Sequence, residues 1–255
     1  MPEAVIVATA RSPIGRAMKG SLAGIRADDL AAQMLSAVMS KVPQLKPSDI
    51  EDVIMGAGQP AGEQGNNVGR LAALLAGIDA PGVTVNRYCS SSLQTIRMAA
   101  HAIKSGEGDC FISAGVECVS RFQYGASDTA PQNSRFADAG ARTALRAGGG
   151  QPKWTAPGGL PDIYIAMGQT AENVREQEGV TREEMDAFGA RSQQLACAHV
   201  ENGFFEREIV PVTLPDGTVV SKDDGPRPGT TAEGLAALKQ PEMLARSTMA
   251  PQPSS

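Results

Sequence analysis

Residues 83–106 constrain the fold more than any other segment, because a β-branched run there leads directly into a helical pattern. Val83, Thr84 and Val85 predict a strand. Apolar residues then recur at helical spacing as far as Gly106: Leu93, Ile96, Ala100 and Ile103. Cys89 lies at the junction, so the sequence predicts a strand, a sharp turn and a helix whose first turn carries a thiol.

A thiol at the start of a helix is well placed for nucleophilic chemistry. The unpaired amides and the positive end of the helix dipole favour the thiolate over the thiol, and the same amides can donate hydrogen bonds to an oxyanion. The alternative is that Cys89 is a small buried hydrophobic residue, as free cysteines commonly are. Composition alone favours this packing role, so the hypothesis of a nucleophile depends on the surrounding motif.

Strand and helix patterns alternate along the first 120 residues. Strands are predicted at residues 4–9, 52–56, 83–85 and 110–116, with helices at 28–42, 68–75 and 93–105. The run at 4–9 is apolar throughout, which is typical of a strand buried on both faces. The alternation predicts a mostly parallel, layered α/β sheet.

The pattern changes near residue 121. The stretch from there to about residue 160 is polar, becomes rich in Gly and Pro, contains Trp154, and predicts a long irregular loop. Helices are predicted from Met167 and after Thr181, where Thr-Arg-Glu-Glu has the form of a capping box. Residues 208–221 predict a β-hairpin around a Pro-Asp-Gly turn.

Composition argues against several classes of function. A net charge of −5 without a basic cluster argues against a nucleic acid partner, and no apolar run approaches the roughly 18 residues of a membrane span. The first residues lack the form of a signal peptide, so a cytoplasmic protein is expected. The 4 cysteines form no Cys-x-x-Cys pair and only 2 histidines accompany them, so neither a metal site nor a disulfide framework is expected.

Two features have competing interpretations. The glycine-rich loop at residues 56–65 suggests a phosphate cradle, but it lacks the Gly-Lys-Ser/Thr of a P-loop, so an ordinary turn is the better interpretation. His199 falls on the apolar stripe of its predicted helix, which favours a packed histidine over a general base. His101 follows Cys89 on the same predicted helix by about 18 Å, beyond hydrogen-bond reach.

Five segments of the chain resemble motifs of the thiolase family. Asn-Arg-Tyr-Cys-Ser-Ser-Ser-Leu-Gln at residues 86–94 resembles the active-cysteine motif Asn-Arg-x-Cys-Ser-Ser-Gly-Leu-Gln, with Ser92 in place of the glycine. Residues 9–15, 114–120 and 167–174 resemble Thr-x-Arg-Thr-Pro-x-Gly, Gly-Gly-x-Glu-x-Met-Ser and Met-Gly-x-Thr-Ala-Glu-Asn-Val. Residues 224–239 resemble the end of the family's inserted loop domain. Several motifs in the right order make the resemblance specific.

The resemblance implies a thiolase-like layered α/β core, present here as its first half, with an inserted α+β loop domain that binds coenzyme A. On this plan the core half is residues 1–120, the loop domain 121–245, and an unmatched, disordered tail 246–255. The resemblance makes Cys89 the catalytic nucleophile.

Two further site residues follow from the resemblance. Arg227 matches a position that contacts coenzyme A, and its guanidinium suits a phosphate; the alternative is a solvated surface arginine. Met167 matches a residue that lines the acyl pocket; the alternative is plain packing.

An acyltransferase activity is also implied. Thiolases act on 3-ketoacyl-CoA and acetyl-CoA through an acyl-thioester on the cysteine, in fatty acid metabolism that includes β-oxidation. Coenzyme A is then a substrate, no cofactor is needed, and a full-length core implies a homo-oligomer. The family's Asn-Glu-Ala-Phe, Gly-His-Pro and Cys-x-Gly segments do not occur in this sequence.

Two alternatives compete with the acyltransferase. The first is a truncated, catalytically incompetent fragment that at most binds coenzyme A or a full-length partner. The second is a decarboxylating condensing enzyme of the ketoacyl-synthase kind, against which the loop-domain motifs argue.

Overall fold

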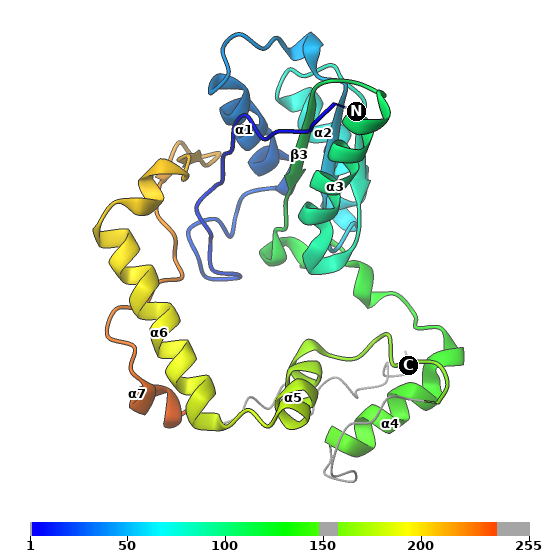
Figure 1. The fold of residues 1–255 in the computed structure, drawn as a ribbon, viewed down its shortest axis with the longest axis vertical. Coiled ribbons are helices and arrows are strands. Elements are labelled where there is room, and N and C mark those ends of the chain that lie inside the picture. Colours follow the sequence, from blue (N-terminus) through cyan, green and yellow to red (C-terminus); the bar gives the residue numbers. More distant parts are fainter. Residues whose placement is uncertain (1, 148–157, 239–255) are drawn as a thin grey trace. The chain divides into compact units, whose positions relative to one another are not determined.

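The computed structural model describes residues 2–147 and 158–238 (Figure 1). Described residues within 1–130 and 199–226 form a first compact unit, and those within 131–198 and 227–255 form a second. Residues 199–226 therefore cluster with the predicted core half. The predicted boundaries of the loop domain rest on the family resemblance and stay a prediction. Trp154 and the predicted tail lie outside the described residues.

The first unit is built on a three-stranded parallel sheet. The strands are β1 (Asp52–Gly56), β2 (Gly82–Val85) and β3 (Phe111–Gly115), in the order β2-β1-β3. The chain thus steps one way from β1 to β2 and the opposite way from β2 to β3. Because crossovers between parallel strands are right-handed, the connecting helices must lie on opposite faces of the sheet. The predicted parallel α/β sheet is confirmed.

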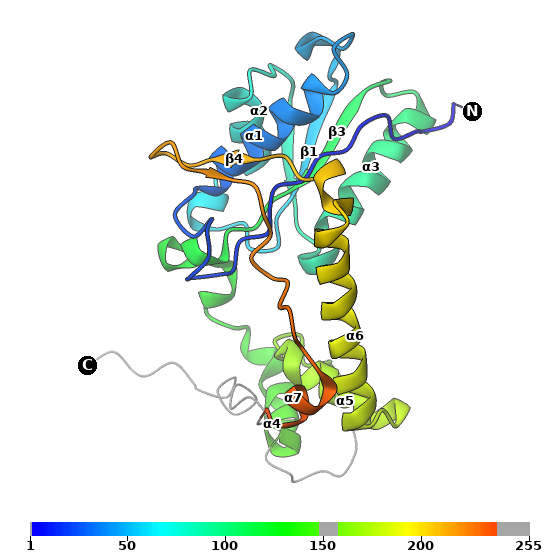
Figure 2. The ribbon, with the colours of Figure 1, turned by 90° about the vertical axis from the view of Figure 1, so that its left-hand side faces the viewer.

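Helices cover both faces of this sheet. Figure 2 shows α1 (Ala27–Ser40) and α2 (Val68–Leu75) on one face and α3 (Ser91–Ser105) on the other. The core lies under α1 and α2, where several large apolar side chains are almost fully buried: Ile25, Leu35, Val53, Met55, Val68 and Ile78. Each such burial contributes about 1.5–3 kcal/mol, so this face anchors the sheet.

The predicted first strand at residues 4–9 is wrong. The segment forms no strand, and the side chains of Val5, Ile6 and Val7 are more than 70% exposed, at 73%, 72% and 73%. An apolar run becomes a strand only when a neighbouring backbone accepts its hydrogen bonds, and no described strand pairs with this one. A cavity of about 710 Å³ is lined by this segment and by β3, and Cys89 does not line it.

Residues 208–224 contain a short hairpin and contact the N-terminal loop. β4 (Val212–Thr213) and β5 (Val219–Val220) pair antiparallel, which confirms the predicted hairpin. Beside it, Arg11 binds Asp223 through both carboxylate oxygens, at 2.8 and 3.0 Å, and Glu208 at 2.7 Å. These contacts join residues about 200 positions apart.

The second unit is helical in its described part. Its helices are α4 (Ala137–Ala147), α5 (Met167–Glu178), most of α6 (Arg182–Glu201) and α7 (Ala232–Ala236). The predicted irregular loop at residues 121–160 is wrong where α4 forms. Alanine is the strongest helix former, and its frequency in this helix outweighs the polar composition. The predicted capping box is confirmed: Thr181 N–H donates to Glu184 Oε2 at 2.8 Å and Glu184 N–H to Thr181 Oγ1 at 3.2 Å.

None of the helices within the described ranges is long and apolar enough to cross a membrane.

Candidate active site

Three loops leave the same edge of the parallel sheet. β1 ends at Gly56, β2 at Val85 and β3 at Gly115, and the paired registers place these three ends side by side. The loops after them carry the glycine-rich segment, Cys89 and Glu117. In open α/β sheets, ligands bind outside the carboxyl ends of the strands, so this edge is the candidate site.

Cys89 lies on a tight elbow between β2 and α3. It occupies a 3₁₀ turn, Tyr88–Ser90, that leads directly into α3, so the thiol precedes the helix that was predicted to carry it. Tyr88 has a φ of 46°, in the left-handed region that side chains with a Cβ rarely adopt. Asn86 Oδ1 accepts the Tyr88 N–H at 2.8 Å, and Ser91 Oγ accepts the Arg87 N–H at 2.9 Å. The sequence itself thus supplies the hydrogen bonds that hold the elbow.

The thiol and the amide of Cys89 are both available. The residue is exposed, which contradicts the alternative of a buried packing cysteine. Among the hydrogen bonds of the described chain, none is donated by the Cys89 N–H. An unpaired amide next to a nucleophile is the arrangement that stabilises a developing oxyanion.

Two other cysteines of this unit have different surroundings. Cys118 is buried, and burial together with the nearby Glu117 carboxylate raises the pKa of its thiol to about 11. Burial also raises the pKa of Cys110, and the carboxylates of Asp49 and Glu51 add to this. Both thiols are therefore held in the unreactive protonated form at neutral pH.

The start of α3 rests directly on the glycines that end β1 and β3. A Cβ atom at residue 56 would lie 2.7 Å from the backbone of Ser91 and Ser92. A Cβ atom at residue 115 would lie 2.0 Å from Ser92 Oγ. Glycine at both strand ends lets the elbow pack closely, and Gly115 leaves room for a serine where the family motif has glycine.

A second set of contacts joins the glycine-rich loop to the end of β3. Glu117 Oε2 accepts the Gly58 N–H at 2.7 Å, and Glu117 Oε1 accepts Gln64 Nε2–H. The buried Gln64 side chain also donates to Gln59 O at 3.0 Å and accepts the Cys118 N–H at 2.8 Å. Sequence reasoning missed this role of the loop; the Glu within the Gly-Gly-x-Glu motif was the one available signal.

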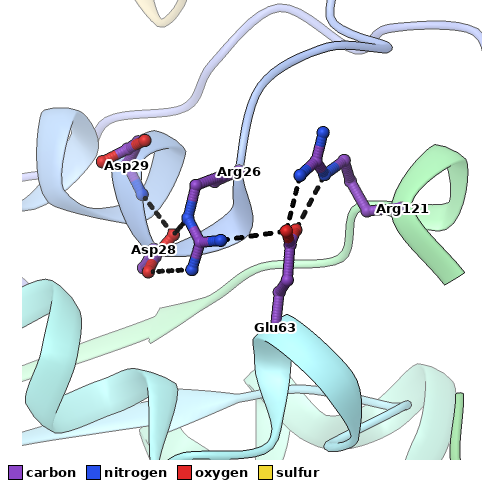
Figure 3. Close-up of polar contacts among 5 residues, drawn as sticks. All are labelled: Arg26, Asp28, Asp29, Glu63 and Arg121. Carbon is purple, nitrogen blue, oxygen red and sulfur yellow. Dashed lines mark hydrogen bonds and ion pairs between the residues drawn. The ribbon is translucent and has the colours of Figure 1, made fainter. Parts of the chain in front are cut away.

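A charged network holds the short 3₁₀ helix Gly62–Gln64 that presents Gln64 (Figure 3). Glu63 accepts hydrogen bonds from Arg121, at 2.7 and 2.5 Å, and from Arg26 at 2.9 Å, while Arg26 also binds Asp28. The hydrogen bond from Arg121 lowers the pKa of Glu63, so the carboxylate is ionised in the folded chain. The network therefore fixes one side of the glycine-rich loop.

Within the described residues, no hydrogen bond joins either histidine to Cys89. His199 is half-buried, as predicted, with its ring centroid 4.8 Å from that of Phe204. Its Nδ1 is buried and has no partner among the described residues. His101 is exposed near the C-terminal end of α3, about 15 Å along the helix axis from Ser91, the first residue of that helix.

Met167 and Arg227 belong to the second unit, whereas Cys89 belongs to the first. Met167 is the first residue of α5 and is 69% exposed. Arg227 is exposed, and its N–H donates to Gln193 Oε1 at 2.8 Å. Their roles toward coenzyme A stay predictions. Within the described ranges no group of three His, Cys, Asp or Glu side chains is arranged to hold a metal ion.

Comparisons with known proteins agree with this geometry. The family model "Thiolase, N-terminal domain" matches residues 4–242. A β-ketoadipyl-CoA thiolase of Acinetobacter baylyi is 44% identical over 248 residues, and a 3-ketoacyl-CoA thiolase of Bacillus subtilis is 38% identical over 253. Each match covers 94% of this chain but only 60% and 59% of the relative, respectively.

A solved structure gives the same result. The dimeric peroxisomal thiolase of Saccharomyces cerevisiae matches with a TM-score of 0.78 and 30% identity, over 94% of this chain and 58% of that one. The chain thus spans about 60% of the length of the curated relatives that it matches. The sheet, the cysteine elbow and these comparisons together show that the chain belongs to the thiolase family.

Proposed function

We propose that Cys89 is the nucleophile of a thiolase-type acyl transfer between 3-ketoacyl-CoA and coenzyme A. The observation that carries the proposal is the exposed thiol of Cys89 on an elbow at the carboxyl edge of the sheet, beside its own N–H, which donates to no partner among the described residues. A nucleophile and an oxyanion donor in one residue are the first requirements of acyl transfer from a thioester or ketone.

The reaction has two acyl-transfer steps. The Cys89 thiolate attacks the 3-keto carbon, the bond between C2 and C3 breaks, and acetyl-CoA leaves as a carbanion equivalent that takes up a proton. The acyl group is then bound to sulfur as a thioester, and the thiol of coenzyme A attacks it to release a shortened acyl-CoA and free Cys89. Coenzyme A is a substrate, and no step needs a cofactor.

The finer assignments belong to the same proposal. Arg227 binds a phosphate of coenzyme A, and Met167 lines the acyl pocket. The relatives are named for β-ketoadipyl-CoA and for 3-ketoacyl-CoA, so the acyl group is either a dicarboxylic one or the plain chain processed in β-oxidation. We place the protein in the cytoplasm and, because the matched structure is dimeric, in a homodimer when the core is full-length.

A second candidate is a chain that binds coenzyme A or a full-length partner without turnover. The chain's coverage of about 60% of its relatives fits both candidates. The second is favoured by the histidines, since neither forms a hydrogen bond with Cys89 in the described chain. Thiolysis needs a base for the thiol and an acid for the leaving carbanion. Acylation of Cys89 by a thioester releases a thiolate and needs no acid for a carbanion.

The test is acylation of the purified chain by acetyl-CoA, followed by proteolysis and peptide mapping by mass spectrometry. We expect one acetyl group on Cys89 and none in the Cys89→Ser variant. An equal acetyl load on Cys197, or an unmodified Cys89, would contradict the assignment of the nucleophile.

A further inference from the structure

We propose that Glu117 is a positioning residue for Cys89. Its carboxylate holds Gly58 against Tyr88, and thereby fixes the direction in which the Cys89 N–H points. The inference rests on the proposed acyl transfer at Cys89, because the amide matters only if an oxyanion forms beside that residue.

The contacts form a continuous path from Glu117 to the elbow. Glu117 Oε2 accepts the Gly58 N–H at 2.7 Å. A Cβ atom at residue 58 would lie 3.6 Å from Tyr88 Cα and 2.8 Å from Glu117 Oε2, so Gly58 fills the space between the carboxylate and the elbow. A side chain at residue 58 would displace the carboxylate.

Tyr88 needs such support. Its left-handed φ of 46° is unfavourable for a residue with a Cβ, so the backbone relaxes unless its surroundings prevent it. Relaxation of Tyr88 would rotate the peptide group that joins it to Cys89, and that peptide group carries the Cys89 N–H. The contact between Gly58 and Tyr88 therefore fixes the direction of the Cys89 N–H, the proposed oxyanion donor.

The Glu117 carboxylate accepts its hydrogen bonds from the glycine-rich loop. It is exposed, and no Arg or Lys forms an ion pair with it among the described residues. Its two oxygens accept hydrogen bonds from Gly58 and Gln64 instead, and Gln64 is held in turn by the Cys118 N–H. A glutamine at residue 117 has an NH₂ group in place of one carboxylate oxygen, and this group faces one of the two donors, so one of the two bonds is lost.

Two reactions at Cys89 separate positioning from general stability. In acetylation by S-phenyl thioacetate, the thiolate adds to the carbonyl carbon, an oxyanion forms, and benzenethiolate leaves. In alkylation by iodoacetamide, the same thiolate displaces iodide and no oxyanion forms. We expect Glu117→Gln to slow acetylation about ten-fold, less than the loss of a whole oxyanion donor, and to change alkylation less than about two-fold.

The experiment measures both rate constants on the full chain by mass spectrometry, at one pH. The small thioester avoids any dependence on the coenzyme A site. Glu201→Gln is the matched control, since Glu201 is an exposed carboxylate of the same unit with no hydrogen bond recorded to it in the described chain. Labelling of Cys110, whose pKa is raised by burial and by Asp49 and Glu51 and does not depend on Glu117, reports any opening of the unit.

Gly58→Ala is the second variant. Its Cβ would displace the carboxylate while leaving every acceptor in place, and the φ of Gly58 lies outside the left-handed region, so the backbone tolerates alanine. If Glu117→Gln speeds the labelling of Cys110, the comparison of the two reactions is made on Gly58→Ala. The expected result is the same selective loss of acetylation.

The outcomes are distinguishable. A parent chain that is alkylated but never acetylated at Cys89 overturns the proposed function, and the role of Glu117 with it. A parent chain that is acetylated, with variants acetylated at the parent rate, overturns the role of Glu117 alone. Equal slowing of acetylation and alkylation also overturns it, because it assigns Glu117 a purely structural role.

Discussion

Cys89 and Cys118 lie in the same unit but have opposite environments. Cys89 is exposed on its elbow, whereas burial and Glu117 hold the pKa of Cys118 at about 11. Because the thiolate is the reactive form, we expect iodoacetamide to modify Cys89 first and Cys118 last of the four cysteines at pH 7. Peptide mapping over time measures the order.

The raised pKa of Cys118 makes its modification depend on pH. The rate at which iodoacetamide modifies Cys118 should rise about ten-fold per pH unit until the pH approaches the thiol pKa of about 11. Since its folded pKa is raised, the protonated thiol stabilises the fold, and this contribution is lost as pH rises toward that value. Modification of Cys118 or Cys110 as fast as Cys89 in the folded chain would contradict the assignment of the nucleophile.

Arg227 permits a separate test at the scale of one residue. If its guanidinium binds a phosphate of coenzyme A, Arg227→Ala should weaken binding by about 1.5–3 kcal/mol, the value of a charge-assisted hydrogen bond. It should also flatten the salt dependence of the affinity. Titration calorimetry measures both, and Arg191→Ala, an exposed arginine in α6, is the control. Unchanged affinity at low salt would remove Arg227 from the site.

At the scale of elements, the contact between α3 and β3 depends on Gly115. A Cβ atom there would lie 2.0 Å from Ser92 Oγ and 3.1 Å from Ser92 Cβ, so Gly115→Ala should destabilise the chain by about 1–3 kcal/mol. Ser92→Gly removes both atoms. The double variant should therefore be more stable than the two single effects predict, as urea unfolding would show. Additive effects would mean that Ser92 moves aside at no cost.

The network around Glu63 connects α1, the glycine-rich loop and the segment after β3. Glu63→Gln should lower the free energy of unfolding by about 1–2 kcal/mol at pH 7, because hydrogen bonds to two arginines lose their charge. The folded pKa of Glu63 is lowered, so its contribution is present above the ordinary carboxyl pKa. The contribution is lost as pH falls through the folded value.

Urea unfolding at neutral and acidic pH tests this network. The difference between the parent chain and Glu63→Gln should shrink as the solution is acidified. Glu201→Gln should show no such difference at either pH. A loss of stability that is equal at both pH values would assign the effect to packing instead of charge.

At the scale of the whole molecule, we expect the 255-residue chain alone not to turn over acetoacetyl-CoA. It has the proposed nucleophile and oxyanion donor, but His101 lies about 15 Å along α3 from the first residue of that helix, and His199 packs on Phe204. Loss of one member of a cooperating catalytic set removes most of the rate. Spectrophotometric thiolysis, with Cys89→Ala as the control, measures turnover; repeated turnovers that vanish in the variant would contradict this expectation.

The sequence by itself determined the local features of this protein. The elbow at Cys89 and the capping box at Thr181 follow from patterns within a few residues, and the parallel sheet follows from the alternation of strand and helix patterns over the first 120 residues. The structure has all three. The sequence also identified the family, because several motifs in the right order are specific where any one of them is not.

Only the tertiary structure decided the features that depend on distant partners. Residues 4–9 have the composition of a strand and form none, because a ladder needs a second backbone. Glu117 and Gly58 are 59 positions apart, and Arg11 and Asp223 are 212 apart. Local periodicity indicates which face of an element is apolar. The position of one loop beside another depends on how the elements pack. These contacts could therefore not be predicted from residue spacing alone.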